Sequence, residues 1–198
     1  VRDVEDMVKR VSESYRKIRN TFKFMLGNLF DFNRKKDATK EFAFLDLMIL
    51  ATLEKVKNTV IQAMDHYDFV SATSAMMNFM SSDLSSFYLD VNKDVLYCDK
   101  ENSLRRRQVQ TVIDRCLDIL MRLWSPILSF TMEEVFQNDP NHEGEYCALL
   151  DYPEETHFYD EYLLQDYAKF LSFRNDVLKA LEVKRGEGQI GSAQEAHV

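Results

Sequence analysis

The feature that most constrains the fold is a helical amphipathic pattern that runs from Asp3 to Asp31. At about 100° per residue, one face collects large apolar side chains at Val4, Met7, Val8, Val11, Tyr15, Ile18, Phe22, Met25, Leu26 and Leu29. The opposite face carries Lys9, Arg16 and Lys23 at intervals of seven, with Asn20 beside them and Arg19 at the border. A pattern sustained for about eight turns predicts one long helix whose apolar face packs into a core.

The rest of the chain favours helices as well. Only 5 Gly and 3 Pro in 198 residues leave little turn chemistry for a many-stranded sheet, and a hydrophobic content of 45% is enough for a sizeable core. Further helices are expected at about 39–67, 69–87, 103–126, 131–136 and 161–185, with loops at 31–40 and 87–99. Thr39 and Ser103 are the expected N-caps, and Pro126 should end a helix. The prediction is an all-α antiparallel helix bundle.

Composition divides the chain into three segments. We expect the bundle over residues 1–137, a polar linker wrapping the bundle over 138–160, and the start of a further region over 161–198. That last region should hold a helix, a turn at GEGQIG and the beginning of a strand from Gln194 to Val198. The chain opens on Val1 and closes on an incomplete strand, so we expect a piece excised from a longer protein.

Charge, cysteines and hydropathy exclude several classes of protein. The net charge of −8 counts against non-specific nucleic-acid binding by the whole surface but allows a local basic stripe. Cys98, Cys116 and Cys147 show no zinc-type spacing and indicate reduced thiols in the cytoplasm. Phe42–Ala51 is the longest nearly uncharged apolar run and is too short to span a bilayer, so no membrane contact is expected.

The polar stripe on the first helix has two interpretations. It is either a solvated helix face or a surface for a negatively charged ligand. On the second interpretation, Lys9, Arg16, Arg19 and Lys23 contact phosphates, and Asn20 hydrogen-bonds a base edge. The planar donor fork of arginine matches phosphate geometry.

Arg105, Arg106 and Arg107 pose a second question, because cations at a helix start oppose the helix dipole. Either RNA phosphates or salt bridges to acidic neighbours could favour them. Trp124 could stack on a base, but it falls in phase with Leu117 and favours core packing.

Catalytic constellations are absent from the sequence. The four histidines are scattered, no Glu-x-x-His repeat suggests a di-metal bundle site, and no glycine-rich phosphate loop occurs. We therefore expect no catalytic residue, no metal ligand and no cofactor in this chain.

Several segments occur in an order that resembles the anticodon-binding domain of class I aminoacyl-tRNA synthetases, in particular the bacterial isoleucine enzyme. They are YRKIRNTFKFMLGNLFDF from Tyr15, DHYDF from Asp65, DLSSFYLDVNKDVLYCD from Asp83, RRRQVQTV from Arg105 and SPILSFTMEEVF from Ser125. The resemblance covers essentially the whole chain. Ser71, Ser129, Phe136 and Tyr152 depart from the family pattern, which usually has His, Pro, Trp and Trp there.

The resemblance implies an RNA-binding module with two partners, the anticodon stem-loop of an isoleucine-accepting tRNA and the rest of the synthetase chain. The parent enzyme is expected to be a monomer. It makes Arg16, Arg19, Asn20 and Lys23 the best candidates for RNA contact, with Lys9, Arg105 and Arg106 as further ones. The parent would use ATP with magnesium and a C-terminal zinc. Its HIGH, KMSKS and zinc-cysteine signatures do not occur in this chain, which alone should not aminoacylate.

Three alternatives stay open. An acidic helical protein-interaction module would account for the net charge and for the acidic segment 151–160. The corresponding domain of the valine, leucine or methionine enzyme would share the same architecture. A metal-dependent bundle enzyme would require bound metal.

Overall fold

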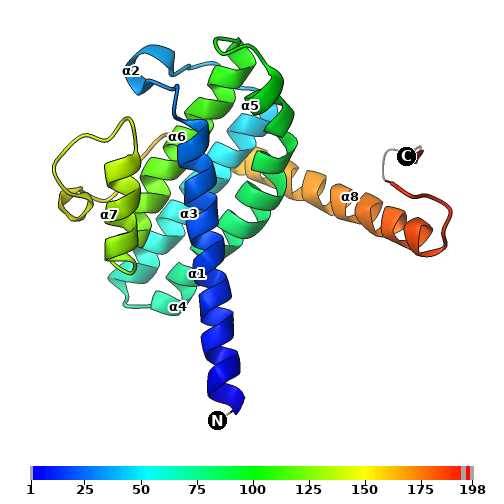
Figure 1. The fold of residues 1–198 in the computed structure, drawn as a ribbon, viewed down its shortest axis with the longest axis horizontal. Coiled ribbons are helices and arrows are strands. Elements are labelled where there is room, and N and C mark those ends of the chain that lie inside the picture. The colour runs from blue at the N-terminus through cyan, green and yellow to red at the C-terminus, as the bar shows by residue number, and fades with distance from the viewer. Residues whose placement is uncertain (1, 193–194, 197–198) are drawn as a thin grey trace. The chain divides into compact units, whose positions relative to one another are not determined.

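The computed structural model describes residues 2–192 and 195–196, and all regular elements among them are helices (Figure 1). This confirms the all-α prediction. The chain divides into two compact units, Val1–Tyr159 and Asp160–Val198. The strand expected over Gln194–Val198 lies largely outside the described residues.

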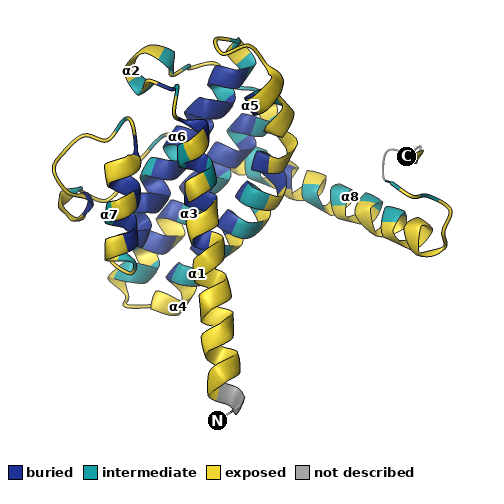
Figure 2. Ribbon diagram, in the orientation of Figure 1, coloured by how far each residue is buried: buried dark blue, intermediate teal, exposed yellow. Residues whose placement is uncertain are grey.

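The first unit is a helix bundle built around α6 (Leu104–Trp124). Helix α6 is buried around most of its circumference, as expected for a helix at the centre of a core. Its neighbours are α1 (Arg2–Asn28), α3 (Phe44–Asp65), α5 (Lys93–Cys98) and α7 (Ser129–Asn138). Figure 2 shows the buried residues gathered in α6 and on the inner faces of these helices. Trp124 is buried in this core, and its indole nitrogen lies 3.1 Å from the sulfur of Met80, so the core interpretation is confirmed.

Helix α1 divides into two halves with different surroundings. Ile18, Phe22, Met25 and Leu29 are at most 5% exposed and pack in the core as predicted. The expectation that the apolar face of the first half packs there too is wrong, because Val4, Met7, Val8 and Val11 are each at least 60% exposed (Figure 2). The amphipathic pattern specified the helix and its apolar face, but it did not specify what covers that face.

The predicted start of the second long helix is also wrong. Helix α3 begins at Phe44, and the Asp46 carboxylate caps it by accepting a hydrogen bond from the Ala43 amide at 3.0 Å. The Thr39 hydroxyl instead accepts from the Glu41 amide at 3.0 Å and closes a turn before the helix. Ser103 does cap α6, since its hydroxyl accepts from the Arg106 amide at 3.2 Å, and α6 ends at Trp124, just before Pro126.

Helix α4 (Phe69–Asn78) continues without a break into η1 (Phe79–Leu89), which is wound as a π-helix. The wider winding brings residues five apart together, and the Ser86 hydroxyl accordingly donates to the Ser81 carbonyl oxygen at 2.6 Å. The loop predicted at 87–99 is wrong in part, because it contains α5. The predicted loop at 31–40 likewise contains the short helix α2 (Arg34–Asp37), capped by Asn33.

The last part of the first unit is an irregular segment fixed to the bundle by specific contacts. It contains one short 3-10 helix, η2 (Cys147–Leu149). Further along, the Arg115 guanidinium lies between two rings, 5.8 Å from the centre of Phe42 and 4.8 Å from that of Phe158. Lys57, buried and paired with Glu54, donates to the Glu154 carbonyl oxygen at 2.8 Å.

The second unit consists mainly of α8 (Glu161–Gly186). Asp160 caps it by accepting from the Leu163 amide at 3.1 Å. Its extent matches the predicted helix at 161–185 to within one residue.

Candidate functional site

A groove of about 660 Å³ runs between α1 and α7, and we call it the α1–α7 groove. Three of the predicted site residues, Arg19, Asn20 and Lys23, line one wall. Thr131 and Glu134 line the other. The 3.6-residue period of α1 brings these residues together, because the turn that buries Phe22 in the core directs its polar neighbours outward.

Arg19 is already engaged by an anion across this groove. Its two terminal nitrogens donate to the Glu134 carboxylate at 2.7 and 2.6 Å, and this hydrogen-bonded pairing lowers the pKa of Glu134. Both side chains are about half exposed, so the pair is weak and open to exchange with another anion. The pair shows that this guanidinium can present its fork to an oxyanion from its position on α1.

The remaining cations of the stripe are uncompensated. Lys9, Arg16 and Lys23 are exposed and form no ion pair with any residue that the structure describes. Intervals of seven residues place successive members about 10.5 Å apart along the helix. Lys9 lies on the exposed first half of α1, whereas Arg16 and Lys23 lie beside the bundle. The stripe is therefore an extended row of positive charge, part of which lies beside the bundle.

The arginines of α6 have very different surroundings. Arg106, which is 6% exposed, donates to the Asp31 carboxylate at 2.6 and 3.0 Å. Arg105 forms a two-pronged pair with Asp46. These partners favour the salt-bridge alternative for Arg105 and Arg106 over the predicted RNA contact, because carboxylates already occupy their donor forks.

Arg107 completes the same cluster. It donates to the backbone carbonyl oxygen of Asp31 at 3.1 Å and to the Gln110 side chain at 2.8 Å. Burial raises the pKa of the Asp31 carboxyl, but hydrogen bonds from Arg106 and Gln110 outweigh that effect, so the net pKa lies below its usual value. The cluster therefore links the end of α1 to α6.

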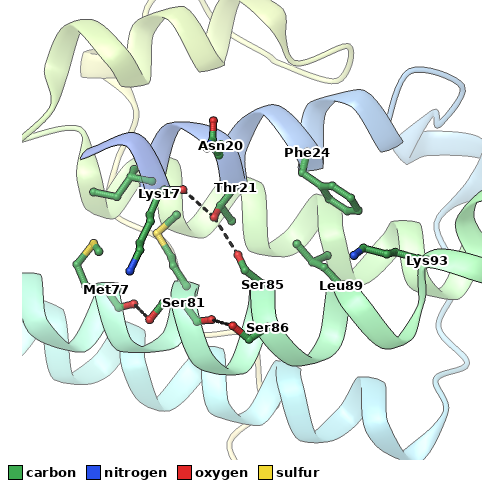
Figure 3. A pocket seen from close by; sticks show the side chains of 12 residues that line it. Lys17, Asn20, Thr21, Phe24, Met77, Ser81, Ser85, Ser86, Leu89 and Lys93 are labelled. Atoms are coloured by element: carbon green, nitrogen blue, oxygen red, sulfur yellow. Dashed lines mark hydrogen bonds between the residues drawn. The ribbon is translucent and has the colours of Figure 1, made fainter. Parts of the chain in front are cut away.

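A second hollow, the α1–η1 pocket, lies on the other side of α1 and encloses about 390 Å³ (Figure 3). Its lining includes Lys17, Thr21, Ser81, Ser85 and Ser86, none of which was predicted as a site residue. The serine-rich run SSDLSS within η1 was the available signal. An α-helical period does not place Ser81 beside Ser86, so the sequence pattern does not predict this part of the pocket.

The described residues contain neither a cluster of potential metal ligands nor a helix suited to cross a membrane. No group of three histidine, cysteine or acidic side chains among them is placed to hold a metal ion. Within the same residues, no helix combines the length and apolar character needed to cross a bilayer.

Comparison with known proteins points to one family. Residues 46–198 match the model of the anticodon-binding domain of tRNA ligase. The isoleucine–tRNA ligase of Bacillus cytotoxicus is 43% identical over 201 residues, which cover 100% of this chain and 22% of the relative. Those of Lactobacillus johnsonii and Staphylococcus carnosus are 43% and 40% identical, over 98% and 100% of this chain and 21% and 22% of their own lengths. The chain thus spans about a fifth of these relatives, and their similarity extends over α1, which the family model leaves out.

Proposed function

The chain belongs to the anticodon-binding domain family of tRNA ligases, and from that premise we propose that it binds the anticodon stem-loop of an isoleucine-accepting tRNA. The observation that carries the proposal is the row of uncompensated cations on α1 beside the α1–α7 groove. Similarity to isoleucine–tRNA ligases across the whole chain supports the choice of tRNA.

The row and the groove suggest a division of roles. Arg16 and Lys23 are spaced to contact backbone phosphates, which fixes the register of the RNA. Asn20 lies between them along the helix, and its amide can both donate to and accept from a base edge. Because bases of single-stranded loops can be unstacked and read individually, a loop lying along α1 would expose its bases to Asn20. Arg19 would exchange its Glu134 partner for phosphate.

The proposal extends to the longer protein only through its relatives. There we propose an isoleucine–tRNA ligase in the cytoplasm, with this chain supplying RNA binding and other segments supplying ligation. The ATP, magnesium and C-terminal zinc expected for such an enzyme concern segments outside this chain and stay predictions, as does the monomeric state.

The test is binding of the 198-residue chain to a fluorescent anticodon hairpin of an isoleucine tRNA, measured by polarisation at several salt concentrations. Affinity should fall as salt rises. Replacing Arg16, Arg19 and Lys23 together by alanine should weaken binding and reduce the salt slope by about 2, since each contact to a single strand contributes about 0.7.

The matched control replaces Lys40, Lys55 and Lys100 by alanine. These lysines are exposed and form no ion pair within the described residues. Replacing them removes the same total charge as the first triple variant. Equal losses in both triple variants would refute the α1 site. Equal affinity for a hairpin from an unrelated tRNA would refute the isoleucine assignment. No binding to any hairpin would favour the protein-interaction alternative.

A further inference from the structure

We infer that the α1–η1 pocket receives one unstacked base of the bound RNA loop, with the adjoining phosphate held by Lys17. This inference rests on the proposed function and adds a site that the polar stripe of α1 does not contain.

The pocket has the size and the apolar surface that a base requires. Its volume of about 390 Å³ falls within the range of small-ligand sites, roughly 300–1,000 Å³. Phe24, Met77, Met80 and Leu89 supply an apolar lining. Figure 3 shows the Phe24 ring extending from α1 above Leu89, so a flat ring system entering between the two helices meets an aromatic side chain. Stacking on aromatic side chains is a general means of holding unpaired bases.

The hydroxyl groups of the pocket can offer a ligand hydrogen-bond acceptors but not donors. Thr21 donates its proton to a backbone carbonyl of its own helix at 3.0 Å, so Ser85, 2.9 Å away, must donate to Thr21. Ser81 and Ser86 likewise donate to backbone carbonyls, at 2.7 and 2.6 Å. The protons of all four hydroxyl groups are therefore engaged, while Ser81, Ser85 and Ser86 retain free lone pairs. This surface suits a ligand that carries N–H donors, as the Watson–Crick edge of every nucleobase does.

Two lysines lie at opposite ends of the pocket, and they differ in their ion pairs among the described residues. Lys93 is paired with Asp90 at 2.6 Å. Lys17 forms no ion pair within the described part of the chain, and Figure 3 shows it extending from α1 towards Ser81 on η1. A single free cation at one end of an otherwise neutral pocket is the arrangement that a base with one adjacent phosphate would use.

The pocket is separate from the α1–α7 groove. Asn20 borders both hollows, but Figure 3 shows its side chain directed away from η1. The two sides of α1 thus offer different chemistry, with an amide on a cationic ridge and a row of acceptors in an apolar pocket. A loop crossing α1 at Asn20 could place one base on each side.

The experiment uses hairpins of the isoleucine anticodon arm carrying the fluorescent base 2-aminopurine at one loop position at a time. Ser86→Phe places a ring in the pocket without altering charge. Ser82→Phe is the matched control, because Ser82 lies on the same π-helix, is exposed and does not line the pocket. We expect one loop position to change fluorescence on binding. Ser86→Phe should abolish that change and weaken binding about tenfold, whereas Ser82→Phe should do neither.

A second pair of variants tests the pocket independently, in case Ser86→Phe disturbs the fold of η1. Lys17→Ala should reduce the salt slope by about 0.7 and diminish the 2-aminopurine signal at the same position, while Lys55→Ala should leave both unchanged. Wild-type affinity and signal in both Ser86→Phe and Lys17→Ala would overturn the pocket and leave the proposed function standing. Failure of the wild-type chain to bind any hairpin would overturn both.

Discussion

Two clusters of cations that look alike in the sequence have opposite surroundings in the fold. At the start of α6, Arg105 and Arg106 are held by the carboxylates of Asp46 and Asp31, and Arg106 is buried. On α1, Lys9, Arg16 and Lys23 face solvent, and Arg19 has an exposed partner in Glu134. The first cluster joins elements of the bundle, and the second is available to a ligand.

The difference arises from residues far away in the chain. The partner of Arg105 is 59 positions distant and that of Arg106 is 75 positions distant, so no local pattern reveals whether a carboxylate will meet the guanidinium. A run of arginines is therefore ambiguous until the fold is known.

Replacing Arg106 by Met should lower the free energy of unfolding by about 3–5 kcal/mol, because it leaves the Asp31 carboxylate partly buried without its main partner. Urea denaturation followed by circular dichroism measures this loss. Under conditions in which this variant remains folded, it should bind the anticodon hairpin with the affinity of the wild type. A marked loss of RNA affinity with unchanged stability would contradict this prediction and would indicate that Arg106 binds RNA.

Acidification should weaken the same cluster. The folded-state pKa of Asp31 is depressed, so its stabilising contribution is complete above the unfolded pKa of about 3.9 and is lost as pH falls through the lower folded value. Comparing wild type with Asp31→Asn, we expect a stability difference at neutral pH that narrows below about pH 4. A gap that stays constant down to pH 2 would contradict this assignment.

On α1, Lys23→Ala should act on binding alone. We expect the salt slope of RNA binding to fall by about 0.7 and the unfolding midpoint to stay at its wild-type value, since no ion pair within the described residues is lost. Polarisation titrations at several salt concentrations measure the slope. Lys55→Ala is the control and should change neither quantity.

Glu134→Gln should have the smallest effect and the opposite sign. It releases Arg19 from its carboxylate partner and removes a negative charge from the α1–α7 groove. RNA affinity should rise by a few-fold at low salt, while stability stays close to the wild-type value, as expected for an exposed pair. Unchanged affinity would mean that Arg19 takes no part in RNA binding.

The sequence allowed the helices to be predicted well where the signal is local. Ser103 is a cap because its own hydroxyl reaches the amide three residues on, and Pro126 ends α6 through its own ring. Local signals failed where a distant group decides the outcome. Asp46 caps α3 in place of Thr39. Val4 and Val8 follow the amphipathic pattern, yet they lie outside the bundle core and are exposed.

The candidate site was predictable to a similar extent. Arg19, Asn20 and Lys23 share one face of a helix, so periodicity alone brought them together. The sequence did not predict the α1–η1 pocket, because the π-helical winding of η1 is needed to bring Ser86 beside Ser81 and because the opposite wall comes from α1. No period applied to one segment could bring Lys17 and Ser85 to a common cavity.

The irregular stretch before α8 has a practical consequence for anyone trimming this chain. Thr156 and the Glu154 carbonyl oxygen supply hydrogen bonds to the buried Glu54–Lys57 pair, so a shortened clone that stops at residue 137 would open a charged pair to water. The smallest piece worth expressing should extend through Phe158. A protease should spare this stretch in the folded chain despite its lack of regular structure, and resistance to digestion would serve as a rapid assay of correct assembly.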